Sequence, residues 1–165
     1  IGADGYWALT NQLDALAAKC GITEDQVEHL LNRYGSLIFD VLSYAKNDAS
    51  LKKPITSAEG YLCVEAVYAA AVEGALHLED VIARRTRISI EYDDRGMDSA
   101  QEIADLIAPV LGWDDATKEK EVKLYRDRVV AELNSQKAIT DEEADALRNQ
   151  AEEARPAYVD DVDKK

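Results

Sequence analysis

The residues with the most evident chemical potential are three arginines in the segment LEDVIARRTRI, at positions 84, 85 and 87. The chain has 165 residues and carries 33 acidic against 19 basic side chains, a formal net charge of -14. Basic side chains gathered in so acidic a chain could hold one anion or one carboxylate partner. Alternatively, Arg84, Arg85 and Arg87 form a solvated helix end, where the helix dipole favours cations.

Two carboxylates near this segment are candidate partners for the arginines. Asp80 precedes Arg84 by four residues, so the two side chains can pair on one helical face. Glu73 lies in an otherwise apolar stretch, and a buried carboxylate needs a partner. A straight helix would separate Glu73 from Arg84 by about 16 Å. We therefore expect the chain to break near Gly74–His77 and fold back, so that one arginine neutralises Glu73.

The motifs that usually mark catalytic or cofactor sites are absent from the sequence. It contains no GxGxxG, no GxxxxGK[ST] and no GxSxG, so no phosphate-cradling loop or nucleophile elbow is predicted. The acids between positions 93 and 102 lack the order of a calcium loop. The two histidines, His29 and His77, are too far apart for the usual zinc pair, and His29 is expected to be structural or solvated. No catalytic, cofactor-binding or metal residue is predicted here.

Apolar residues recur at helical spacing through most of the chain, which predicts an all-α fold. We expect an irregular bundle of about six to eight helices around a central helix, Tyr61–Ala75, whose sequence only Glu65 and Glu73 interrupt. A helix that is apolar on every side is normally covered by others. A short helix is expected at Leu78–Arg85. The alternating residues of Ile88–Tyr92 instead indicate an extended strand without an obvious partner.

Composition and local signals also suggest the organisation of the chain. Residues 1–135 are expected to form one helical domain, and residues 136–165 a charged helical extension with a disordered tail. The pair Thr23 and Gln26 predicts a capping box, and Cys20 and Cys63 are expected to be buried, reduced thiols. No apolar run approaches the ~20 residues that span a bilayer, and the first residues do not resemble a signal peptide. The expected location is cytoplasmic.

One stretch carries a family resemblance. EAVYAAAVEGALHLEDVIARRTRISIE, Glu65 to Glu91, resembles the C-terminal helical domain of aerobic, FAD-dependent glycerol-3-phosphate dehydrogenases. GADGY, VEHLLNRYGS and LGWD, which begin at positions 2, 27 and 111, agree with it. The resemblance spans roughly Gly2 to Leu133. One departure is Val72, where many relatives have histidine.

The resemblance implies an accessory part of a larger enzyme. Its parent would oxidise sn-glycerol 3-phosphate to dihydroxyacetone phosphate and pass the electrons through FAD to a quinone. In that family the FAD domain lies N-terminal to this segment, so FAD is expected in the parent and not in this chain. The parent is expected to be peripheral at the cytoplasmic face of the membrane. The expected partners are the catalytic FAD domain of the same chain and a possible homodimer mate, with no direct membrane insertion by this segment.

Within that picture five residues are candidates for structural or interface roles: Glu73, Asp80, Arg84, Arg85 and Arg87. Arg84 or Arg85 is expected to bind a carboxylate inside the domain, while Arg87 and the segment after it reach toward the catalytic domain. Two alternatives stay open. The chain could be an autonomous all-α protein-interaction module, or TEDQVEHLLNRYG could begin a helix-turn-helix. The acidic balance disfavours the latter and nucleic acid generally.

Overall fold

The computed structural model describes residues 2–154, and nearly all of their regular structure is helical. The described residues form nine α-helices, two short 3-10 helices (η1 and η2) and one π-helical segment (η3). The expected all-α fold is therefore confirmed. In chain order they are α1 (Tyr6–Thr10), α2 (Leu13–Cys20), α3 (Glu24–Tyr34), η1 (Gly35–Leu37), α4 (Ile38–Ser43), η2 (Ala49–Lys52), α5 (Cys63–Ala71), η3 (Asp80–Arg85), α6 (Ile88–Glu91), α7 (Ala100–Leu111), α8 (Asp115–Ser135) and α9 (Asp141–Arg148).

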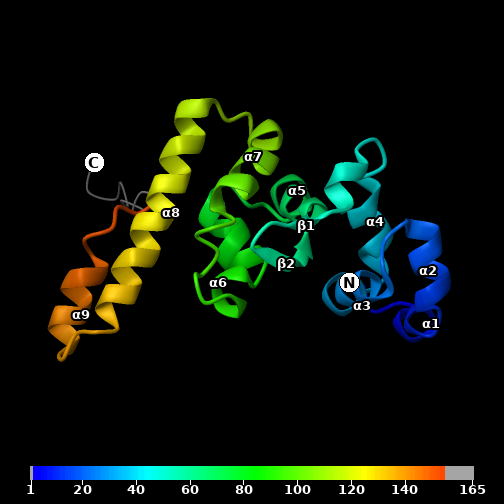
Figure 1. The fold of residues 1–165 in the computed structure, drawn as a ribbon, viewed down its shortest axis with the longest axis horizontal. Coiled ribbons are helices and arrows are strands. Elements are labelled where there is room, and N and C mark those ends of the chain that lie inside the picture. The colour runs from blue at the N-terminus through cyan, green and yellow to red at the C-terminus, as the bar shows by residue number, and fades with distance from the viewer. Residues whose placement is uncertain (1, 155–165) are drawn as a thin grey trace, which may run out of the picture.

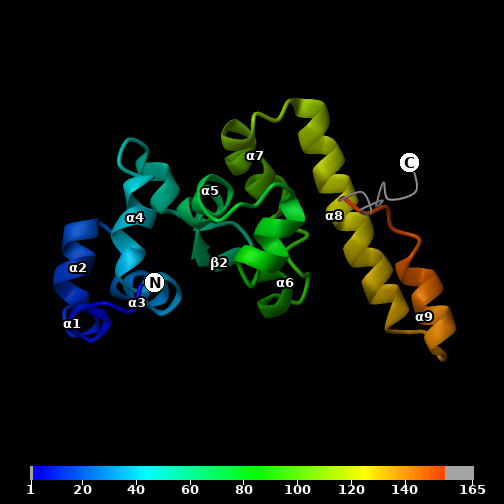
Figure 2. The same ribbon diagram turned by 180° about the vertical axis from the view of Figure 1, so that it is seen from behind.

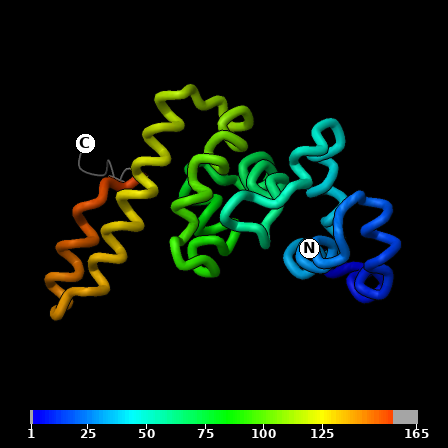
Figure 3. The backbone as a smooth tube through the Cα atoms, in the orientation of Figure 1, coloured from blue at the N-terminus to red at the C-terminus, as the bar shows by residue number. Residues whose placement is uncertain are grey.

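The helices are arranged along one long axis. Figure 1 shows α1 to α4 at one end, α5 to α7 in the middle, and α8 with α9 at the other end. The view from behind gives the same order (Figure 2), and the tube in Figure 3 shows that the chain crosses the molecule once from end to end. The middle group is therefore the part that both ends pack against. The tail that was predicted to be disordered, beyond position 156, lies outside the described residues.

Helix α5 is the central helix, and it contributes to two hydrophobic cores. Its residues Cys63, Ala66 and Ala69 belong to a core shared with η3, α7 and α8. Its residues Val64 and Tyr68 belong to a second core shared with α2, α3 and α4. The expected helix Tyr61–Ala75 was too long at both ends, because α5 covers only Cys63–Ala71. The chain breaks after it as expected, with Gly74 at a φ of 72°.

A β-hairpin precedes α5, and the sequence interpretation missed it. Strand β1 (Pro54–Ile55) pairs antiparallel with β2 (Ala58–Leu62). The hairpin buries Ile55, Ala58 and Tyr61 in the core shared with α7. The strands are short, and Tyr61 continues without interruption into apolar helical sequence. Periodicity alone therefore assigned the end of β2 to the helix.

The strand expected at Ile88–Tyr92 is wrong, because this segment is the short helix α6. The main-chain N–H groups of Ile90 and Glu91 both donate to the carbonyl of Arg87. Ile88 is fully buried, whereas Ile90 is 72% exposed, so the alternation does not mark one buried face. An ion pair of Arg87 with Glu91, four residues apart, fits the helical turn.

The N-terminal segment is held by a close contact between two glycines. The N–H of Ser36 donates to the carbonyl of Gly2 at 2.9 Å. A Cβ at Gly35, whose φ is 58°, would lie 1.8 Å from that same carbonyl oxygen. Only glycine fits there, which links the GADGY and RYGS stretches structurally. The expected capping box of Thr23 and Gln26 is present at the start of α3.

The last two described helices form a hairpin. Asp114 caps α8 by accepting from the N–H of Thr117 at 2.8 Å. From α8, Val122, Tyr125 and Val129 reach the core shared with α7. Helix α9 has no buried residue and packs back along α8. The predicted domain boundary at residue 135, at the end of α8, stays a prediction.

Candidate functional site

Asp80 organises the chain break after α5. Its carboxylate is fully buried. Oδ2 accepts from the N–H groups of Leu76 and His77 at 3.0 and 3.1 Å, and Oδ1 lies 3.2 Å from Nη1 of Arg84. Arg84 also donates to Glu79 at 2.6 Å. The predicted Asp80–Arg84 pair is therefore present, and Asp80 additionally holds the backbone of the break.

Arg85 reaches Glu73, although not in the expected way. Its Nε donates to the main-chain carbonyl of Glu73 at 2.8 Å, so the chain folds back as predicted. The expected neutralisation of the carboxylate is wrong: within residues 2–154 no hydrogen bond or ion pair reaches it, and its Oε2 is buried. Burial raises the pKa of Glu73, and the opposing attraction of Arg33 and Arg85 does not cancel this effect.

Arg87 is the most exposed of the three arginines, with 65% of its side chain accessible. Its Nε lies 3.4 Å from Oε1 of Glu91, on the surface of α6. An exposed pair of this kind contributes only a few tenths of a kcal/mol. The three arginines therefore diverge, and they do not converge on one anion site. Their proposed roles, structural or interfacial, stay predictions.

A second fully buried carboxylate belongs to Glu65, which the sequence interpretation did not single out. Its side chain is fully buried in α5. Nε2 of His29 lies 3.0 Å from both of its oxygens, and Nε of Arg33 lies 3.3 Å from Oε1. The N–H of Leu62 completes the set at 2.8 Å. His29 and Arg33 are four residues apart on α3, a spacing that could have indicated a shared carboxylate partner.

Arg33 extends this network to the arginine segment. Its Nη2 donates to the carbonyl of Arg85 at 2.6 Å, and its guanidinium lies over the ring of Tyr61. The hydroxyl of the neighbouring Tyr34 is buried without a hydrogen-bond partner within residues 2–154, and burial raises the pKa of Tyr34. Together these contacts fasten α3, α5 and η3 to one another. Their evident effect is to fix the fold.

The cysteines are both free. Cys63 is buried at the start of α5, as expected, but Cys20 is only partly buried. Burial, reinforced by the carboxylate of Glu102, raises the pKa of Cys63 to about 11. A thiol in that state is a poor nucleophile at neutral pH. Cys63 is therefore a packing residue.

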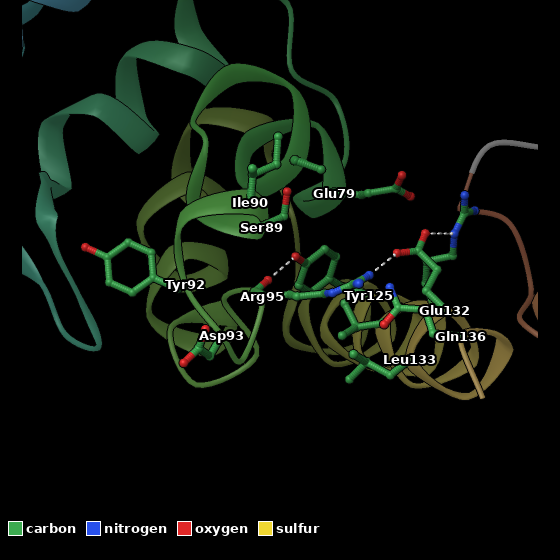
Figure 4. A pocket seen from close by; sticks show the side chains of 13 residues that line it. Glu79, Ser89, Ile90, Tyr92, Asp93, Arg95, Tyr125, Glu132, Leu133 and Gln136 are labelled. Atoms are coloured by element: carbon green, nitrogen blue, oxygen red, sulfur yellow. Dashed lines mark hydrogen bonds and ion pairs between the residues drawn. The ribbon is translucent and has the colours of Figure 1, made fainter.

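A cleft of about 570 Å³ lies where α8 passes the α6 region (Figure 4). Its size would suit a small ligand. Its basic groups are already bound, however, because Arg95 and Arg128 both contact Glu132, at 2.8 and 2.9 Å. The hydroxyl of Tyr125 donates to the carbonyl of Arg95. The polar groups of the cleft hold α8 to the body of the domain, which is their simplest role.

The described residues show neither a dinucleotide-binding turn nor a cluster of metal ligands. A dinucleotide needs a glycine-rich turn between a strand and a helix. The junction of β2 and α5 has no glycine from Leu62 to Val64, and the N–H of Leu62 already donates to Glu65. Within residues 2–154, no group of three or more His, Cys, Asp or Glu side chains is placed to hold a metal. None of the helices described here is long and apolar enough to cross a membrane.

Comparison with known proteins places the chain in a family. A family model described as the C-terminal domain of alpha-glycerophosphate oxidase matches residues 1–118. The chain is thus a C-terminal helical domain of the kind found in glycerophosphate-oxidising enzymes. It belongs to the family of C-terminal domains of alpha-glycerophosphate oxidase. No solved structure matches it.

The relatives are much longer than this chain. Glycerol-3-phosphate dehydrogenase 2 of Mycobacterium tuberculosis is 56% identical over 162 residues, which is 98% of this chain and 28% of the relative. Glycerol-3-phosphate dehydrogenase of Mycobacterium leprae is 52% identical over the same shares. A probable mitochondrial glycerol-3-phosphate dehydrogenase of Dictyostelium discoideum is 34% identical over 125 residues, 74% of this chain and 19% of the relative. The chain therefore spans little more than a quarter of the mycobacterial proteins.

Proposed function

We propose that this chain is the C-terminal accessory domain of an FAD-dependent sn-glycerol-3-phosphate dehydrogenase. The observation that carries the proposal is the extent of the match: 52% and 56% identity over 98% of this chain, to proteins named as glycerol-3-phosphate dehydrogenases. The parent oxidises glycerol 3-phosphate to dihydroxyacetone phosphate, FAD accepts the hydride, and a quinone receives the electrons. The parent works at the cytoplasmic face of the membrane.

The domain itself acts by packing and by protein–protein contacts. Its buried charges are engaged in fixing α3, α5 and η3, as Glu65 and Asp80 illustrate. Its flavin would have to be held elsewhere in the parent, because the β2–α5 junction does not suit a pyrophosphate. The partner is the catalytic FAD domain of the same polypeptide, and a homodimer mate is a further candidate.

The test compares three proteins: the full-length parent, the parent truncated before Gly2, and this chain alone. Each is measured for flavin absorbance and for glycerol 3-phosphate-dependent dye reduction. We expect flavin and activity in the full-length parent, and neither in this chain alone. The truncated parent reports how far the accessory domain supports the enzyme. Flavin and activity missing from the full-length parent would overturn the proposal and favour the interaction-module alternative.

A further inference from the structure

The carboxylate of Glu73 is an energetic anomaly in the described fold. Its Oε2 is buried and has no hydrogen-bond partner within residues 2–154, and the attraction of Arg33 and Arg85 does not offset the cost of burial. Buried polar atoms are hydrogen-bonded in the great majority of cases, and a buried charge without a partner is costly. Glu73 stands at the chain break after α5, at the surface end of that helix. A donor from outside the described residues would remove the anomaly.

The basic side chains that follow Glu73 in the sequence, and Arg33 of α3, each make another contact. Arg84 binds two carboxylates, and Arg87 binds one. Arg85 uses its Nε on the main-chain carbonyl of Glu73, and Arg33 is directed to Glu65 and to the carbonyl of Arg85. Redirecting Arg33, Arg84 or Arg87 to Glu73 would break one of these contacts. Arg85 binds the main chain of Glu73 and leaves the carboxylate without a hydrogen bond. The missing donor is therefore most simply a basic side chain from another part of a larger protein.

Apolar side chains flank Glu73 and are open to solvent. Val72 is 51% exposed and Leu76 is 63% exposed. Val72 immediately precedes Glu73, and Leu76 follows it by three residues. Glu73 therefore lies between two exposed apolar residues in the chain. Exposed apolar residues on either side of Glu73 in the chain suit a partner surface that carries a basic side chain among apolar ones.

We propose that the segment Ala71–His77 is the surface on which this domain docks onto the remaining part of its parent polypeptide, where a basic side chain binds Glu73 between Val72 and Leu76. The inference rests on the proposed function, because the chain accounts for only 28% of the mycobacterial relatives, which leaves a large partner in the same polypeptide. Arginine fits best, since guanidinium is weakly hydrated and can donate two hydrogen bonds to a carboxylate.

The test uses the full-length parent with the photo-crosslinking residue p-benzoylphenylalanine in place of Leu76. Irradiation should join this position to residues outside the 165-residue domain, in a product with the mass of a single polypeptide. The matched control places the same crosslinker at Ile139, which is 95% exposed in the turn between α8 and α9, where no such product is expected. Peptide mass spectrometry identifies the joined residues.

A second variant tests the carboxylate. Glu73→Gln should abolish the crosslink from position 76, whereas Glu59→Gln, at an exposed position of β2, should leave it unchanged. Thermal melting of each protein verifies that it is folded. The proposal is overturned by an unchanged crosslink in Glu73→Gln, by crosslinks confined to the 165 residues, by products of doubled mass from a second copy, or by no product.

Flavin absorbance and dye reduction on the same preparations separate this inference from the proposed function. An active flavoprotein without the crosslink overturns the docking surface and leaves the function standing. A crosslink to the rest of the polypeptide without flavin or activity supports the docking surface and overturns the function.

Discussion

The imidazole of His29 lies 3.0 Å from each carboxylate oxygen of Glu65, which is fully buried at the start of α5. Replacement of Glu65 by alanine would leave His29 and Arg33 facing a buried gap. Removal of one partner from a buried ion pair typically costs about 3–5 kcal/mol. We expect Glu65→Ala to lower the free energy of unfolding by about that amount, as measured by urea denaturation.

The matched control for this change is Glu28→Ala. Glu28 precedes His29 on α3 but is exposed, so its replacement should alter stability by less than about 0.5 kcal/mol. Similar losses in the two variants would mean that the Glu65 network does not stabilise the fold.

A methyl group at position 35 should be poorly tolerated. The Cβ of Gly35→Ala would lie 1.8 Å from the carbonyl oxygen of Gly2, at a φ of 58°. Backbone strain together with displacement of the N-terminal segment should cost at least about 3 kcal/mol. Gly112→Ala is the comparison, because φ there is 69° but a Cβ would meet nothing within 4 Å. It should cost only about 1 kcal/mol, and equal thermal shifts for the two variants would contradict the close contact.

Glu73 should make the chain alone less stable as the pH rises. Burial raises its folded-state pKa above the ordinary value of 4.5, so the folded state binds this proton more tightly than the unfolded state does. Its contribution to stability is therefore complete below pH 4.5 and declines as the pH rises through the folded-state pKa. Glu73→Gln should lose this dependence.

At pH 7 we expect the glutamine variant of the chain alone to be the more stable protein. The gain should be less than about 1 kcal/mol, since the side chain is only half-buried. Urea denaturation between pH 4 and pH 7 measures the difference. A glutamine variant whose stability changes with pH in parallel with the wild type would contradict the assignment to Glu73.

Cys63 should report on unfolding through its reactivity. With its pKa at about 11, only about one thiol in a thousand is ionised at pH 8, and burial shields it further. Iodoacetamide should therefore label the partly exposed Cys20 first in the folded chain, and Cys63 only in denaturing urea. Mass spectrometry of the labelled peptides distinguishes the two sites, and rapid labelling of Cys63 in native buffer would argue against its burial.

The features that the sequence predicted correctly depend on residues close in the chain. The capping box of Thr23 and the Asp80–Arg84 pair are set by spacings of three and four residues. The chain break was predicted from the rise per residue of an α-helix. In a straight helix Glu73 would lie too far from the arginines to contact them. Local geometry was sufficient in each case, because no distant segment had to be placed first.

The features that the sequence did not predict depend on distant segments. Glu65 and Glu73 look alike in an apolar run. Only the position of α3 gives Glu65 its partners His29 and Arg33, which lie 36 and 32 residues away in the sequence. The alternation at Ile88–Tyr92 suggested a strand with Ile88 and Ile90 on one buried face. Tertiary packing buries Ile88 but leaves Ile90 exposed, and the sequence pattern does not reveal this difference. The hairpin of β1 and β2 was hidden because Tyr61 has the same apolar character as the helix that follows it.

The position of α5 in both hydrophobic cores has a consequence for how the domain unfolds. Residues of the same helix fill both cores, so the loss of either core would leave one apolar face of α5 open to water. Residues 2–133 should melt as one cooperative unit, although they extend along a long axis. A division near the middle of this unit would open one of the two cores, so recombination would have to transfer residues 2–133 as a whole.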